Sequence, residues 1–220
     1  MGFRAAIFDM DGTILDTLED LYESVNASLR WAGCPERSRE EVRHFVGNGA
    51  WMLIRRAVPR EMPDVDARRV LEWYRPYYEE HAQIKTAPYP GIPEALETLR
   101  AAGCRLAVVS NKPDGATRKL AEHYFPGAFD AVIGAREGVA VKPAPDALLD
   151  AMDRMGVRAA ETVYVGDSEV DIATARNAGL PCISVAWGFR EEDFLRRNGA
   201  SFFARSPEEL IEAVLGPETV

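Results

Sequence analysis

A chain of 220 residues with 47% hydrophobic and 28% charged residues has the composition of a globular protein that buries its own core. Its 35 acidic residues outnumber 26 basic ones, and no apolar run approaches the roughly 20 residues of a membrane span, so we expect neither a nucleic-acid nor a membrane partner. Its three cysteines are far apart and include no C-x-x-C pair, which is typical of free thiols in the cytoplasm.

The first predicted element is a buried strand over residues 5–8, where four apolar residues stand in a row. Asp9 and Asp11 follow it at once, with Gly12 and Thr13 directly after them. Two carboxylates at the edge of a core repel each other unless a cation compensates their charge. The pair therefore indicates a cation at the end of this strand.

Residues 17–86 carry the spacing of helices and no strand pattern. Apolar side chains recur at helical spacing over residues 18–32, and Ser38 with Glu41 forms the capping box of a second helix. Residues 66–81 predict a further helix, whose aromatic side chains we expect in the core of this segment: Trp73, Tyr74, Tyr77 and Tyr78. We therefore expect an all-helical insert between the first strand and the rest of the chain.

After residue 86, short β-branched runs alternate with helical stretches. Strands are predicted at residues 104–111, 130–135, 162–167, 181–187 and 201–204. Such alternation is typical of a parallel sheet with helices on both faces. We expect an α/β fold, in which residues 1–16 and 87–220 form a Rossmann-like core and residues 17–86 form the helical insert.

Polar side chains follow several predicted strands at the point where each strand ends. These residues are Asp9, Asp11, Ser110, Asn111 and Asp167. Asp171 follows one helical turn after Asp167, and Lys142 lies in a loop with the sequence VKPAP. Each of these residues alone is an ordinary helix cap, turn or surface residue. Together they predict an active site, because ligands bind beyond the carboxyl ends of the strands in an open parallel sheet.

Four short segments contain these polar residues: DMDGTILDT (9–17), VVSNK (108–112), VKPAP (141–145) and GDSEVD (166–171). Together they resemble the four motifs of the haloacid dehalogenase-like (HAD) hydrolase superfamily. The helical insert resembles the first type of α-helical cap in that family. Two further segments, FVGNGA (45–50) and APYPGIPEAL (87–96), are similar to bacterial phosphoglycolate phosphatases.

The resemblance implies that Mg²⁺ is bound by Asp9, by the backbone carbonyl of Asp11 and by Asp167. Asp9 would attack phosphorus and form an aspartyl-phosphate. Asp11 would protonate the leaving alcohol and then take a proton from the attacking water. These roles would explain why two carboxylates follow the first predicted strand.

The remaining motif residues are implied to bind the phosphoryl group. Ser110 would donate a hydrogen bond to a phosphoryl oxygen, helped by backbone amides near Gly12 and Asn111. Lys142 would offset the charge between the nucleophile and the phosphate. Asp171 would orient Lys142 or a metal-bound water.

The function expected from this resemblance is hydrolysis of a small phosphorylated metabolite, with 2-phosphoglycolate as the first candidate. Alternatives are a mutase of the β-phosphoglucomutase type, a HAD phosphatase acting on a sugar phosphate, a nucleotide or pyrophosphate, and a catalytically silent binding module. A dehalogenase is disfavoured because its chemistry needs no metal and no second aspartate like Asp11. A phosphonatase is disfavoured because residues 17–84 contain no lysine for a Schiff base.

Three further features have two readings each. The stretch Gly47, Asn48 and Gly49 is expected to be a tight turn between helices, and alternatively its backbone N–H groups bind an anion such as a substrate carboxylate. Lys112 and Arg190 carry charges within reach of a substrate in one reading, but we expect both at the surface. We expect a monomer or a homodimer.

Overall fold

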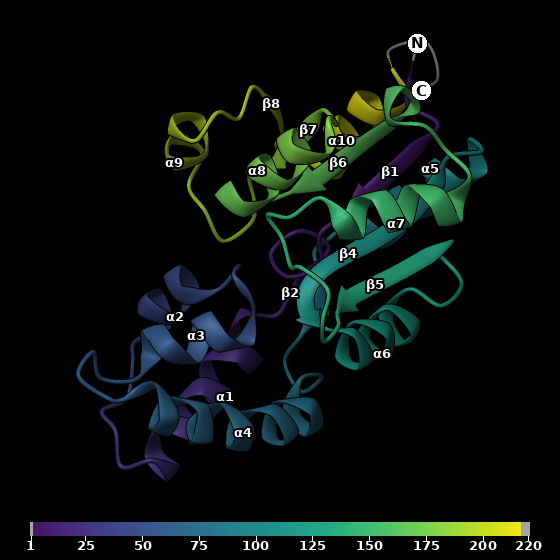
Figure 1. Ribbon diagram of the computed structural model, residues 1–220. Helices are drawn as coiled ribbons and strands as arrows, with labels where there is room; N and C mark the ends of the chain where they lie inside the picture. Colours follow the sequence, from purple (N-terminus) through teal and green to yellow (C-terminus); the bar gives the residue numbers. More distant parts are fainter. Residues whose placement is uncertain (1, 217–220) are drawn as a thin grey trace.

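The computed structural model describes residues 2–216, and the sheet within them has six parallel strands in the order β5-β4-β1-β6-β7-β8 (Figure 1). The strands are β1 (Ala5–Phe8), β4 (Arg105–Pro113), β5 (Ala131–Ala135), β6 (Thr162–Gly166), β7 (Cys182–Val185) and β8 (Phe202–Ala204). Phe8 pairs with Val108 on one side and with Val165 on the other. The ends of three motif-bearing strands therefore lie side by side.

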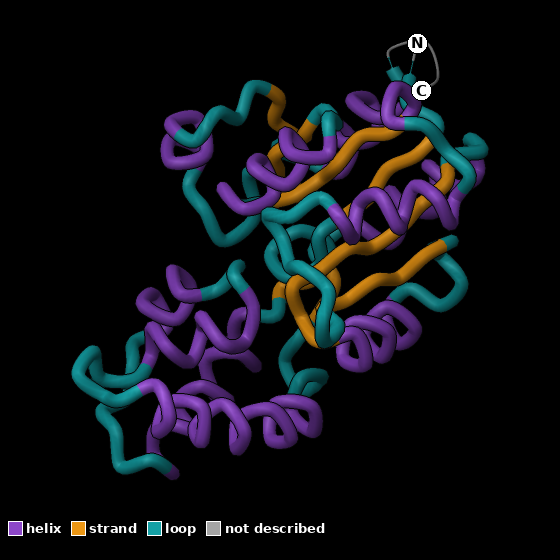
Figure 2. Tube along the Cα trace, viewed as in Figure 1, coloured by secondary structure: helices purple, strands orange, loops and turns teal. Residues whose placement is uncertain are grey.

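Helices cover both faces of this sheet (Figure 2). They are α5 (Ile92–Ala101), α6 (Asp114–Tyr124), α7 (Asp146–Met155), α8 (Glu169–Ala178), α9 (Glu192–Arg197) and α10 (Pro207–Leu215). Ala6 and Phe8 face the apolar cluster under α5 and α10, whereas Ala5 and Ile7 face the cluster under α7 and α8. The strand is apolar throughout because both of its faces are buried. The predicted fold class is confirmed.

Residues 17–86, which the structure describes in full, contain four helices and no strand. They are α1 (Leu18–Trp31), α2 (Arg39–Phe45), α3 (Gly49–Ala57) and α4 (Asp64–His81). The capping box of Ser38 and Glu41 opens α2 as predicted. Two short antiparallel strands, β2 (Leu15–Asp16) and β3 (Ala87–Pro88), join this insert to the sheet, and the sequence pattern did not predict them.

The insert packs around an apolar cluster of its own, which includes Val25, Ile54 and Val70. Tyr74 and Tyr78 lie in this cluster as predicted, with 2% and 4% of their surface exposed. Trp73 and Tyr77 do not: both are half-buried and stack in line with the exposed Trp31 on the outside of the insert. They occupy the other face of α4, because residues at i and i+4 share one face of a helix.

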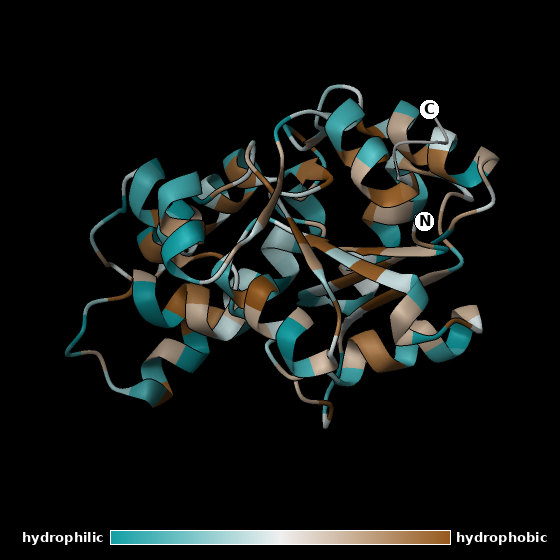
Figure 3. Cartoon of the chain, turned by 90° about the horizontal axis from the view of Figure 1, so that it is seen from above, coloured by the Kyte–Doolittle hydropathy of each residue, from teal (hydrophilic) through white to brown (hydrophobic). Residues whose placement is uncertain are grey.

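Apolar colour in Figure 3 runs along the strands at the centre, while hydrophilic colour marks many outer turns of the helices. Within residues 2–216, no helix combines the length and the apolar character that crossing a membrane requires.

Candidate active site

The chain turns sharply after β1 because Gly12 takes a backbone conformation that other residues rarely adopt. The N–H of Asp9 donates to the Val165 carbonyl at 2.8 Å and extends the pairing of β1 with β6. Gly12 then has a φ of +82°, and a Cβ at this position would lie 2.3 Å from Oδ2 of Asp167. Gly12 is therefore required both by the left-handed turn and by the close approach of Asp167.

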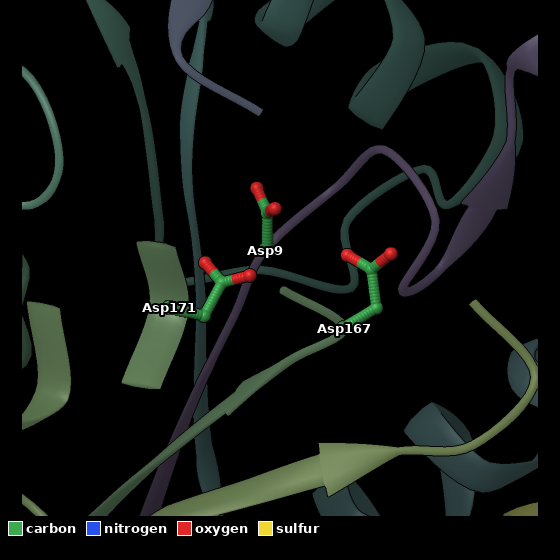
Figure 4. Close-up of side chains that lie close together, drawn as sticks. All are labelled: Asp9, Asp167 and Asp171. Carbon is green, nitrogen blue, oxygen red and sulfur yellow. The ribbon is translucent and has the colours of Figure 1, made fainter. Parts of the chain in front are cut away.

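Three buried carboxylates lie together at the carboxyl end of the sheet (Figure 4). Asp9 follows β1, Asp167 follows β6, and Asp171 belongs to the first turn of α8; one oxygen of each lies within 4.8 Å of the others. Burial raises the pKa of Asp9 to about 7, opposed by Lys142 and supported by Asp171. Burial, with Asp171 and Asp9 nearby, also raises the pKa of Asp167 well above its ordinary value. The group thus holds more negative charge than its surroundings neutralise.

Lys142 reaches into this acidic group from its loop and is 3% exposed. Its Nζ lies 2.8 Å from Oδ1 of Asp9, 2.8 Å from Oδ1 of Asp171 and 2.9 Å from the Tyr164 hydroxyl. Burial alone would lower the pKa of Lys142, but the two carboxylates raise it above its ordinary value. Burial would raise the pKa of Asp171, and Lys142 more than reverses this effect. Lys142 and Asp171 therefore form a charged pair.

The Asn111 side chain holds the loop of Lys142 in place. Its Oδ1 accepts a hydrogen bond from the Lys142 backbone N–H at 2.8 Å, and its Nδ2 donates to the Lys142 carbonyl at 3.0 Å. The same Nδ2 donates to the Gly47 carbonyl of the insert at 3.0 Å. The sequence pattern suggested only a backbone role for Asn111. Ser110 lies beside Asn111, is 5% exposed and lines a cavity between the insert and the sheet.

The Asp11 carboxylate lies outside the acidic group. Its Oδ1 accepts a hydrogen bond from the Thr17 hydroxyl at 2.7 Å and lies 3.1 Å from Nζ of Lys112. Lys112 is only 5% exposed, so the prediction that it lies at the surface is wrong. Tyr78 from α4 covers it and accepts a hydrogen bond from its Nζ. Its position directly after Ser110 and Asn111 at the end of a predicted strand was the signal for this location.

The prediction of a surface position is also wrong for Arg190, which is 8% exposed. Its guanidinium donates to three backbone carbonyls at the end of α2, those of Arg43, His44 and Val46, and pairs with Glu169 at 3.2 Å. The last carbonyls of a helix have no partner inside the helix, and Arg190 supplies one. It therefore joins the insert to the sheet.

We expect Arg190→Ala to lower the free energy of unfolding by about 1–3 kcal/mol, because the variant leaves buried carbonyls of α2 without a donor. Urea unfolding followed by circular dichroism measures this change. The matched control is Arg118→Ala, which removes an exposed pair with Asp114 and should cost less than about 1 kcal/mol. An equal effect of both substitutions would contradict the capping role of Arg190.

The neighbouring Phe189 connects the insert with the acidic group. Its backbone N–H donates to Oδ2 of Asp167 at 2.7 Å, while its side chain packs in the apolar cluster of the insert. Oδ1 of Asp167 accepts a hydrogen bond from the Thr13 hydroxyl at 3.3 Å. Both oxygens of Asp167 are thus oriented, one from each side.

A cavity of about 800 Å³ lies between the insert and the carboxyl end of the sheet. Its walls include Asp9, Asp11, Ser110, Lys112, Lys142 and Asp167 from the sheet side, and Gly47, Asn48, Gly49, Tyr74 and Tyr78 from the insert. Gly47 and Asn48 lie in the turn between α2 and α3, and Gly49 is the first residue of α3. Oδ1 of Asn48 accepts a hydrogen bond from Arg56 at 2.7 Å, which orients this turn.

Residues 6–185 match a family model described as haloacid dehalogenase-like hydrolase. The chain belongs to this hydrolase family. The hydrolase is 34% identical over 215 residues to a phosphoglycolate phosphatase of Pseudomonas putida, with 95% of this chain and 76% of that protein covered. It is 34% identical to a phosphoglycolate phosphatase of Vibrio parahaemolyticus, with 94% of each chain covered.

A crystal structure from Lactobacillus delbrueckii subsp. bulgaricus, described as a candidate phosphoglycolate phosphatase, superposes on the hydrolase with a TM-score of 0.93. The two chains are 40% identical, and the superposition covers 99% of this chain and 100% of the other. The expectation of a HAD hydrolase with phosphatases among its relatives is confirmed.

HAD hydrolases generally use a divalent metal ion, and the acidic group of this hydrolase fits one. Carboxylate oxygens are the ligands that hard divalent cations prefer. Oδ1 of Asp9 is buried, and the Lys142 ammonium, which also faces Asp171, lies 2.8 Å from it. One ammonium among three carboxylates leaves a net negative charge, which a bound cation would compensate.

Proposed function

We propose that this hydrolase is a Mg²⁺-dependent phosphatase that converts 2-phosphoglycolate to glycolate and phosphate through an aspartyl-phosphate. The observation that carries the proposal is the Asp9 carboxylate, which lines the cavity and lies 2.8 Å from the Lys142 ammonium. Lys142 and the acidic group surround it with the charges that phosphoryl transfer uses.

Asp9, the backbone carbonyl of Asp11 and Asp167 hold the metal ion in this proposal, and the ion supplies positive charge that offsets the phosphate. A carboxylate oxygen of Asp9 forms a bond to phosphorus while the bond from phosphorus to the ester oxygen breaks. Asp11 gives its proton to that leaving oxygen. In the second half, Asp11 takes a proton from water, the water oxygen attacks phosphorus, and Asp9 leaves as a carboxylate.

The other motif residues bind the phosphoryl group and do not exchange protons. Ser110 donates a hydrogen bond to a phosphoryl oxygen, together with backbone N–H groups near Gly12 and Asn111. Lys142 stays charged and lies between the nucleophile and the phosphate. Asp171 holds Lys142 in position through the contact of 2.8 Å.

We further propose that residues 17–86 act as a cap domain on a core of residues 1–16 and 87–220. Gly47, Asn48 and Gly49 form the wall of the cavity opposite Asp9 and close it over the substrate. Exclusion of water strengthens each charge interaction in the site and protects the intermediate until its own hydrolysis step.

Three cysteines without a disulfide, Cys34, Cys104 and Cys182, support a cytoplasmic location.

The proposal predicts phosphate release from 2-phosphoglycolate with a kcat/KM about tenfold or more above that for hexose phosphates, glycerol phosphate, nucleotides and pyrophosphate. EDTA should abolish the release, and excess Mg²⁺ should restore it. A colorimetric phosphate assay measures both. Interconversion of sugar phosphates without release would favour the mutase, and no reaction with any compound would favour a silent module.

A further inference from the structure

Lys112 is a buried cation that the four-motif mechanism does not use. It lies in β4, directly after Asn111, and its side chain is 3% exposed. Its Nζ lies 3.1 Å from Oδ1 of Asp11 and donates a hydrogen bond to the hydroxyl of Tyr78. The side chain forms part of the cavity wall. Asp11 compensates this ammonium while its carboxylate is charged, but once Asp11 holds the proton that the proposed mechanism requires, Lys112 is a buried ion without a charged partner, which is unfavourable.

The other cationic side chains of the cavity wall are already matched or solvated. Lys142 faces two carboxylates, Arg190 faces one carboxylate and three carbonyls, and Arg136 pairs with an exposed aspartate. Arg75 is exposed to solvent. Among the described residues of the wall, Lys112 is therefore the buried lysine whose one carboxylate partner, Asp11, is the proposed proton donor.

The position of Lys112 corresponds to the leaving-group side of the reaction. In the proposed mechanism, Asp11 hands its proton to the leaving oxygen, and Lys112 lies 3.1 Å from that same carboxylate. Groups attached to the carbon that bears the leaving oxygen then lie within reach of Nζ. A negative group at this place would form a charge-assisted hydrogen bond with the ammonium.

We propose that Lys112 is the specificity-determining residue that binds the carboxylate of a phosphorylated 2-hydroxy acid. The inference rests on the proposed function and assigns to one side chain the recognition of the acid. Tyr78 holds the ammonium from the side of the insert, with Nζ 4.4 Å from the centre of the tyrosine ring. Recognition therefore depends on residues from both the sheet and the insert.

The test compares two substrates that differ only in the group that Lys112 would bind. They are 2-phosphoglycolate and 2-hydroxyethyl phosphate, in which a hydroxymethyl group replaces the carboxylate. The variant Lys112→Met keeps the length of the side chain and removes its charge. The ratio of kcat/KM for the two substrates should fall about 10- to 100-fold from wild type to variant. Loss of the Lys112 charge also affects the neighbouring Asp11, but this effect changes kcat/KM for both substrates alike and therefore leaves their ratio unchanged.

Two control variants accompany this measurement. Tyr78→Phe keeps the ammonium and the ring beside it and removes only the hydroxyl partner, so the ratio should fall by less than it does in the Lys112 variant. Lys119→Met removes an exposed lysine that does not line the cavity and that pairs with the exposed Glu79 of its wall, and the ratio should not change. If Lys112→Met does not fold, Lys112→Gln replaces it, with folding judged by circular dichroism.

An unchanged ratio in a folded Lys112 variant would overturn the inference while leaving the phosphatase proposal intact. The wild type alone tests that proposal: release from neither ester overturns the proposed function and the inference with it. Competitive inhibition of the wild type by glycolate should weaken in the Lys112 variant in parallel with the ratio. Equal inhibition of both proteins would also overturn the inference.

Discussion

Asp9→Asn is expected to reduce phosphate release by at least about 10³-fold while the protein remains folded. The amide has nearly the same shape as the carboxylate but is a poor nucleophile, so the aspartyl-phosphate does not form. Folding should not suffer, because Asp9 is a strained member of the acidic group and Lys142 keeps Asp171 as its partner. Phosphate release and circular dichroism, measured on the same preparation, test the two statements.

The stability of this variant without metal has a predictable pH dependence. Burial raises the pKa of Asp9 from 3.8 to about 7, so the folded protein binds this proton more tightly than the unfolded chain does. Ionisation of Asp9 therefore lowers stability as the pH rises from 3.8 to about 7. Asp9→Asn cannot ionise, and in EDTA at pH 8 its unfolding midpoint in urea should equal or exceed that of wild type. Turnover above about 1% of wild type would refute the covalent mechanism.

The strands of the sheet could be predicted from the sequence because they are buried on both faces. Residues 5–8 form an unbroken apolar run for this reason, and the polar residues Asp9 and Asp167 follow directly where β1 and β6 end. Parallel strands place all such ends on one edge, so the grouping of Asp9 with Asp167 followed from the topology. The pairing of β2 with β3 was not predicted, because strands of two residues are too short to show an alternating pattern of apolar and polar residues.

The position of Lys112 after a predicted strand indicated that it lies near the site, but the sequence could not predict that the insert buries Lys112 and Arg190. Each is a charged residue whose exposure depends on where the insert docks, and a local pattern holds no information on that docking. Arg190 is buried by the end of α2 and Lys112 by Tyr78, contacts between residues 34 or more positions apart. The side-chain role of Asn111 could not be predicted for the same reason, because its hydrogen bond to the Gly47 carbonyl joins the sheet to the insert.

These contacts give the sheet and the insert a shared boundary at the active site. Asn111 binds the insert with the same amide that holds the loop of Lys142, and Phe189 packs in the insert while its backbone orients Asp167. The geometry of the lysine and of the acidic group is therefore linked to the docked position of the insert. Opening of the insert would release these contacts together.

Lys142→Met is expected to lower both activity and stability, by two separable effects. Activity should fall at least about 100-fold, because the charge between the nucleophile and the phosphate is lost. The free energy of unfolding in EDTA should fall by about 3–5 kcal/mol, because Asp171 and Asp9 remain buried without their cation. Urea unfolding and phosphate release measure the two effects.

The double variant Lys142→Met with Asp171→Asn separates them. It removes one of the two buried carboxylates that the single variant leaves unpaired, so part of the lost stability should return, whereas activity should stay low. Arg154→Met is the matched control, since it breaks an exposed pair with Asp150 and should cost less than about 1 kcal/mol. A double variant that regains activity would show that Lys142 serves only to neutralise Asp171. A double variant as unstable as the single one would show that packing of the lysine stem, and not its charge, stabilises the site.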